Sequence, residues 1–104
     1  YGKELIFTAQ MIDAQEAYRI GLVNKVVPQE QLMDEVKKTA KKIASNAKIA
    51  VQLAKAAVNR GINCDVITGI AYEAEVFGLC FATEDQKEGM AAFVEKRKAN
   101  FTDK

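Results

Sequence analysis

The chain has 104 residues, 49% of them hydrophobic, which is enough for one domain with a modest core and too few for two. The 15 Lys and Arg residues and 14 Asp and Glu residues give a net charge of +1, so the charge predicts neither nucleic acid nor an anionic membrane surface as a partner. With no histidine, and with Cys64 and Cys80 outside any metal-ligand spacing, a zinc site and a histidine-activated nucleophile are excluded, and we expect reduced, partly buried thiols.

The first part of the chain predicts two short helices and one short strand. Residues 1–7 are typical of the tail of a helix that begins before them, and Asp13 is a suitable N-cap for a second helix, which Gly21 would end. Residues 22–27 are short, rich in β-branched side chains and followed by the only proline, Pro28, so they predict a strand. A lone strand has unpaired backbone groups and needs a partner outside the chain or a solvated edge.

From residue 29 the pattern is helical. A first helix breaks at Ser45, and a second would end at residues 59–61, where Gly61 is available for a positive φ. Asp65 is a good N-cap for a third helix. The apolar stripe expected on this helix consists of Ile67, Ile70, Ala71, Ala74, Phe77 and Gly78. Small residues along these stripes permit close approach between helices.

The last expected helix starts at about Thr83. Thr83 and Gln86 form a capping box, and the acids that follow Thr83 favour the positive end of the helix dipole. The basic run 96–98 would lie at the other end, where the dipole favours cations. Glu84 and Glu88 are four residues apart, but acids near the start of a capped helix need no catalytic role, and we assign them none.

Two long segments resemble one enzyme family. Residues 81–101 contain Phe-Ala-Thr-Glu-Asp and then Glu-Gly-Met-x-Ala-Phe-x-Glu-Lys-Arg-x-x-x-Phe, which closely resembles the C-terminal end of the crotonase superfamily, the enoyl-CoA hydratases. Residues 3–27 are similar to the stretch after the family's catalytic region, and the likeness is greatest to short-chain bacterial members. The resemblance implies a mainly α fold, with residues 1–104 forming a single helical domain, the C-terminal oligomerisation region of the crotonase fold, without the catalytic core.

The same resemblance implies what the chain does and what it lacks. In the family, two backbone N–H groups stabilise the enolate and two glutamates handle the protons, and all lie before anything that resembles Tyr1. We therefore expect no catalytic residue and no hydratase activity in this chain. The whole enzyme would hydrate short-chain 2-enoyl-CoA reversibly to 3-hydroxyacyl-CoA, without a metal or redox cofactor. The family forms trimers that often pair as hexamers, so we expect self-association, with a monomeric bundle as the alternative.

Three residues are candidates for contact with coenzyme A. The CoA part of the substrate carries an adenine, which an aromatic side chain recognises, and several phosphates, which Lys or Arg recognises. Phe93 and Lys96 are three residues apart on the expected last helix, so both can reach one site. By resemblance they meet the CoA bound by a neighbouring subunit, and Phe77 lines its adenine end. Phe93 can equally be a core or trimer contact, and Lys96 a cation favoured by the helix end.

Other functions stay open. The scaffold also carries enoyl-CoA isomerases and 1,4-dihydroxynaphthoyl-CoA synthases, and its fold does not determine the chemistry. A non-catalytic helical interaction module is the third alternative. No apolar run has the length of a membrane span and no secretory pattern opens the chain, so we expect a cytoplasmic protein with no membrane partner.

Overall fold

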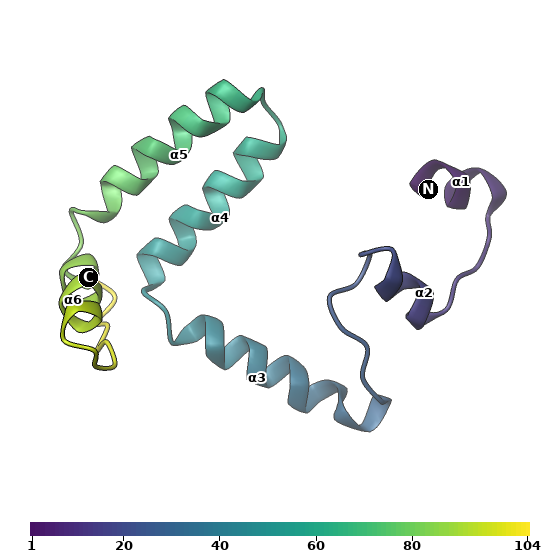
Figure 1. Cartoon of the computed structure of the whole chain (residues 1–104), viewed down its shortest axis with the longest axis horizontal. Coiled ribbons are helices and arrows are strands. Elements are labelled where there is room, and N and C mark those ends of the chain that lie inside the picture. Colours follow the sequence, from purple (N-terminus) through teal and green to yellow (C-terminus); the bar gives the residue numbers. More distant parts are fainter. The chain divides into compact units, whose positions relative to one another are not determined.

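The computed structural model describes all 104 residues, Tyr1 to Lys104. Its regular elements are all helices, which confirms the expected mainly α class (Figure 1). The helices are α1 (Gly2–Thr8), α2 (Ala14–Arg19), α3 (Leu32–Ala44), α4 (Lys48–Ile62), α5 (Val66–Cys80) and α6 (Glu84–Val94), with a 3-10 turn η1 (Gln29–Gln31) before α3. The contacts divide the chain into two compact units, Tyr1–Lys37 and Lys38–Lys104, with α3 running across the division.

Helix α2 in the first unit has the two ends predicted from the sequence. The Asp13 carboxylate accepts a hydrogen bond from the Glu16 backbone N–H at 2.8 Å, as an N-cap does. At the other end Gly21 has φ 77°, and the Leu22 N–H reaches the Ala17 carbonyl at 2.9 Å. This is a Schellman motif, in which the residue with positive φ is usually glycine because glycine has no Cβ.

Glu16 connects α1 to α2. Its carboxylate accepts hydrogen bonds from the Tyr1 hydroxyl at 2.6 Å and from Arg19 Nη2 at 2.6 Å. The Arg19 hydrogen bond, then that of Tyr1, lowers the pKa of Glu16 to about 2, and the bond to Glu16 raises the pKa of Tyr1.

The strand expected over residues 22–27 does not form. The segment has bends and irregular backbone and pairs with no other segment. Its β-branched composition favours extended backbone, but a strand also requires a neighbour for its N–H and C=O groups, and this chain offers none. The prediction of a strand was wrong for the chain by itself.

Helices α4 and α5 form an antiparallel hairpin in the second unit (Figure 1). They approach closely where Gly69 of α5 meets Gly61 of α4, since a Cβ on Gly69 would lie 3.5 Å from the Gly61 Cα. Gly69 is not on the stripe expected on α5, and a Cβ on Gly78, which is on that stripe, would meet nothing within 4 Å, so this contact is not the one that the sequence predicted. Nor is Gly61 a helix terminator: α4 continues to Ile62, and the Asn63 side chain donates to the Asn59 carbonyl at 2.9 Å to finish the helix.

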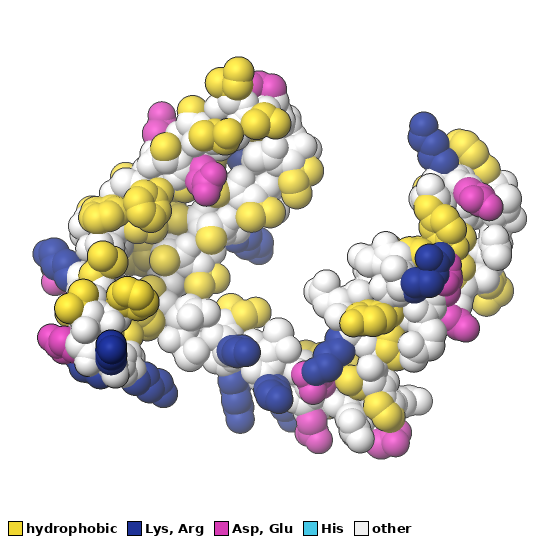
Figure 2. Space-filling model, in the orientation of Figure 1, with side chains coloured by type: hydrophobic (Ala, Val, Ile, Leu, Met, Phe, Trp, Pro, Cys, Tyr) yellow, Lys and Arg dark blue, Asp and Glu magenta, His cyan; other side chains and the backbone are white.

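Few apolar side chains are buried in the chain. Only Ala17, Val76 and Ala92 are. Of the stripe expected on α5, Ile67, Ile70 and Phe77 are 82%, 59% and 66% exposed. Figure 2 shows hydrophobic side chains gathered on the surface over α4 and α5. These faces therefore lack a partner within the chain.

No single helix of the chain has the length and apolarity to cross a membrane. Helices α5 and α6 pass that test only together, and they bend by 85° at the break between them.

Candidate functional site

Helix α6, the helix expected to carry two of the CoA candidates, begins where the sequence predicts, but the capping box is only half formed, because the Thr83 N–H donates to the Cys80 carbonyl at 3.0 Å. The Thr83 hydroxyl accepts from the Gln86 N–H at 3.1 Å and donates to the Cys80 carbonyl at 2.6 Å, so this side chain links the end of α5 to the start of α6. Asp65 caps α5 in the same way, accepting from the Thr68 N–H at 3.0 Å.

The other end of α6 differs from the prediction. The helix ends at Val94, and Lys96 has φ 53°, outside the helical region. The Arg97 N–H donates to the Ala92 carbonyl at 3.0 Å and the Lys96 N–H to the Phe93 carbonyl at 3.3 Å, which together make a second Schellman motif. Lys96 therefore lies beyond the helix, and the expectation that Phe93 and Lys96 lie on one helix was wrong.

A cluster of charged side chains closes this turn. Arg97 Nη1 and Nη2 donate to the two Glu88 oxygens at 2.5 and 3.2 Å, and Arg97 Nε donates to Glu95 Oε2 at 2.5 Å. Glu88 also accepts from the Asn100 N–H at 2.9 Å. The Arg97 guanidinium, then the Asn100 N–H, lowers the pKa of Glu88 to about 2, and the two carboxylates raise the pKa of Arg97. We call Glu88, Glu95 and Arg97 the Arg97 cluster; the sequence had given Glu88 no role.

A second carboxylate holds the end of the chain against α6. Asp85 is 2% exposed, and it accepts from the Thr102 N–H at 2.7 Å and from the Asp103 N–H at 2.9 Å. In return the Asp85 N–H donates to the Lys104 carbonyl at 3.0 Å. Residues 98–104 thus turn back along α6, and Asp85 is a buried charge with each oxygen hydrogen-bonded.

Phe77 lines two mainly apolar cavities. One is a groove of about 550 Å³ between α4 and α5, where Phe77 lies with Leu53 and Val76. The other has a volume of about 230 Å³ and is bounded by α4, α5, α6 and the last residues of the chain, including Phe101. The Phe77 ring also meets the Phe81 ring edge to face, with centroids 5.3 Å apart.

The three predicted CoA contacts do not form one pocket in this chain. Phe93 is 83% exposed and Lys96 is exposed, and neither lines a cavity that Phe77 lines. The structure does bring Phe93 and Lys96 next to each other, through the backbone hydrogen bond of the second Schellman motif. No group of His, Cys, Asp or Glu side chains could hold a metal ion. Cys64 and Cys80 are free and half-buried, as expected.

A profile of the enoyl-CoA hydratase/isomerase family matches residues 2–104. The chain is 59% identical over 102 residues to a crotonyl-CoA hydratase of Syntrophomonas wolfei, a match that covers 98% of this chain and 39% of that protein. It is 62% identical over 96 residues to a short-chain-enoyl-CoA hydratase of Clostridium acetobutylicum, covering 92% of this chain and 37% of that protein.

The crystal structure of an enoyl-CoA hydratase from Bacillus anthracis superposes with a TM-score of 0.92 at 44% identity, covering 98% of this chain and 40% of that one. The helical fold expected from the resemblance is thereby confirmed. The chain spans about two fifths of the length of the relatives that it matches.

Proposed function

Because the chain belongs to the enoyl-CoA hydratase/isomerase family, we propose that it is part of an enzyme that reversibly hydrates short-chain 2-enoyl-CoA to 3-hydroxyacyl-CoA. The observation that carries this proposal is the 59% identity, along almost the whole chain, to a protein named for crotonyl-CoA hydration. Hydration brings no net change of oxidation state, so the proposed enzyme needs no redox cofactor, and the family resemblance implies that it uses backbone N–H groups and glutamates rather than a metal ion.

In this proposal the chain contributes assembly and contact with CoA. The apolar faces of α4 and α5 are exposed within the chain, which suits surfaces that pack on the rest of the enzyme or on another subunit, in a trimer or hexamer. Phe93 has an exposed aromatic ring and Lys96 an exposed cation, the two kinds of group that recognise adenine and phosphates, and a backbone hydrogen bond joins the two residues. Phe77 would line the adenine end.

The chain alone is proposed to be inactive. Hydration requires a group that can accept a proton near neutral pH, and the pKa of Glu88 is lowered to about 2 by its partners, which makes it a poor base. Glu84 is paired with Lys87 at 3.2 Å on the exposed side of α6. Glu84 and Glu88 line one cavity of about 370 Å³, but each is paired with a cation, Glu84 with Lys87 and Glu88 with Arg97.

One experiment tests the reaction. The coding sequence on both sides of the chain is determined, and we expect a Gly-rich oxyanion loop and two separated glutamates in the same reading frame. A single glutamate would favour the second candidate, an enoyl-CoA isomerase, which the family description also covers. A frame without either feature would overturn the enzymatic proposal and leave a helical interaction module.

A second experiment tests the role of the chain. In a chimera, the chain replaces the matching 102 residues of the Syntrophomonas wolfei crotonyl-CoA hydratase. We expect the chimera to hydrate crotonyl-CoA, the isolated chain to have no activity, and Lys96→Ala in the chimera to weaken CoA binding by about 1.5 to 3 kcal/mol. A folded chimera whose CoA affinity is unchanged by Lys96→Ala would refute the proposed contact.

A further inference from the structure

We propose that Glu88 is a positioning residue for CoA: acting through Arg97, it fixes the turn that presents Lys96 to the phosphate groups. The inference rests on the proposed function, because it takes Lys96 as the cation that meets CoA. It adds two residues, Glu88 and Arg97, that do not themselves touch the ligand.

The first observation is the backbone of Lys96. The chain contains two Schellman motifs, and at the same position one has Gly21 with φ 77° and the other has Lys96 with φ 53°. A residue with a Cβ is disfavoured in this conformation, and the motif itself would be served better by glycine. Ala9 and Asp103 also have a positive φ, 51° and 63°, so the conformation alone indicates no use; what distinguishes Lys96 is a side chain that ends in an exposed ammonium group.

The second observation is that the residue after Lys96 is held by hydrogen bonds while the Lys96 side chain is not. Arg97 is held by both oxygens of Glu88 and by Glu95, and the Asn100 N–H is held by Glu88. The Lys96 ammonium makes no ion pair or hydrogen bond and is exposed. The Arg97 cluster thus fixes the backbone after Lys96 and leaves its charge available.

The third observation is the local charge. Two carboxylates near the turn, Glu88 and Glu95, are both engaged by Arg97. The single cation Arg97 offsets one of these two negative charges, and the unpaired cations Lys96 and Lys98 outweigh the other, so an approaching phosphate meets a net positive charge at the turn. A backbone that is already fixed loses less conformational freedom when the ligand binds, so the cluster would favour binding without touching the ligand.

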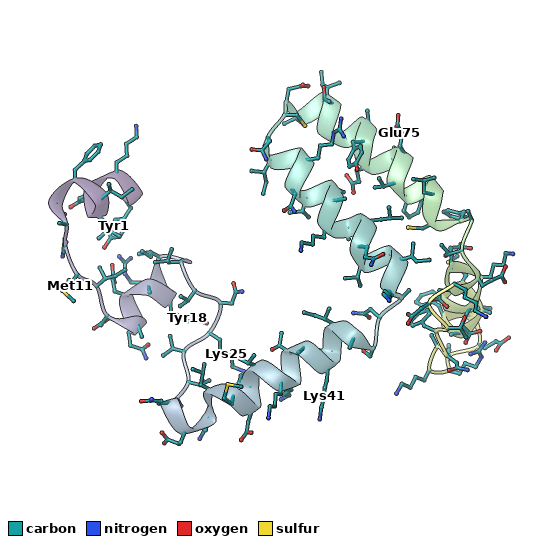
Figure 3. All side chains as sticks on the ribbon, turned by 180° about the vertical axis from the view of Figure 1, so that it is seen from behind. Tyr1, Met11, Tyr18, Lys25, Lys41 and Glu75 are labelled. Carbon is teal, nitrogen blue, oxygen red and sulfur yellow. The ribbon has the colours of Figure 1, made fainter.

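The test uses the hydratase chimera and two substrates that share a thioester, crotonyl-CoA and crotonyl-pantetheine; the second has no adenosine and no phosphate. We expect Glu88→Gln to raise the KM for crotonyl-CoA on the order of tenfold with little change in kcat, and to leave the KM for crotonyl-pantetheine unchanged. Arg97→Lys, which keeps the charge but loses the bidentate geometry, should give the same pattern. The control is Glu75→Gln, an equal change of charge on α5, where Glu75 projects away from α4 (Figure 3).

A double-substitution cycle separates this inference from the proposed function. If Glu88 acts through Lys96, Glu88→Gln has no further effect on KM once Lys96→Ala is present. An equal effect in both backgrounds, or an equal rise in KM for both substrates, would overturn the positioning role while leaving Lys96 as a contact. No change in KM with Lys96→Ala alone would refute the contact and, with it, the inference. If Glu88→Gln does not fold, Arg97→Lys gives the same decision.

Discussion

The Arg97 guanidinium donates hydrogen bonds to both carboxylate oxygens of Glu88, at 2.5 and 3.2 Å, although the two residues are nine apart in sequence. The spacing is too long for neighbours on a helix, so the contact exists only because the chain turns sharply after Val94. The two side chains therefore report whether that turn is present.

The stability of the chain should depend on pH through Glu88. Its pKa is lowered from the usual 4.5 to about 2, so its contribution to folding is fully present above pH 4.5 and is lost as the pH falls toward 2. We expect the urea midpoint of Glu88→Gln to decrease less than that of the wild type across this range. Part of the dependence remains in the variant, because the pKa of Glu16 is also about 2. An identical decrease in both proteins would contradict the assignment, and Glu75→Gln is the control for the loss of one charge.

Lys96→Gly should stabilise the chain. Glycine adopts a positive φ without the Cβ penalty, and after allowing for its greater freedom in the unfolded state we expect a gain of about 0.5 to 1 kcal/mol in the free energy of unfolding. Gly21→Ala makes the opposite change in the same motif and should cost about 1 kcal/mol. Both are measured by urea unfolding followed by circular dichroism. A loss of stability with Lys96→Gly would show that the lysine side chain, rather than the backbone, stabilises the turn.

Asp85→Ala should destabilise the chain by about 2 kcal/mol or more. The substitution leaves the N–H groups of Thr102 and Asp103 without the charged acceptor that they share in a buried position. Asp85→Asn should fall in between, because an amide has one acceptor oxygen for the two N–H groups. Equal stability of Asp85→Ala and the wild type would mean that the end of the chain is not held against α6.

The contact between α4 and α5 should tolerate a methyl side chain at position 69 but not a larger one. A Cβ would lie 3.5 Å from the Gly61 Cα and 3.6 Å from Cys64 Sγ, which is ordinary contact, so Gly69→Ala should be neutral or stabilise α5 by up to about 1 kcal/mol. Gly69→Leu needs space that the two backbones occupy and should cost about 1 to 3 kcal/mol. The helix content of the two variants at increasing temperature distinguishes them; a Leu variant as stable as the Ala variant would show that the hairpin is not closely packed there.

The features that the sequence predicted well are those set by neighbouring residues. The caps at Asp13, Asp65 and Thr83 depend on an oxygen and an N–H three residues later, and the structure has all three. The end at Gly21 depends on one residue that lacks a Cβ. Such local rules hold whatever the rest of the protein does.

The features that could not be predicted from the sequence depend on residues farther along the chain or on groups that the chain does not contain. Lysine at position 96 favours a continuing helix, so the end of α6 at Val94 could not be recognised without the bonds that Glu88 makes to residues 97 and 100. The strand over residues 22–27 requires a partner that this chain does not supply. The residue types of the candidate site could be predicted from the sequence, while the turn that places Lys96 beyond the helix of Phe93 is seen only in the structure.

The hydrogen bonds from Thr102 and Asp103 to Asp85 should slow the hydrogen exchange of these two backbone amides. Amides this close to a C-terminus ordinarily exchange with deuterium as fast as those of an unstructured peptide. Here both are hydrogen-bonded to a buried carboxylate, so they should retain their protons longer than the amides of exposed loops. The last residues would thus serve as a built-in reporter, in which the isotope content of one short C-terminal peptide tells whether α6 is intact.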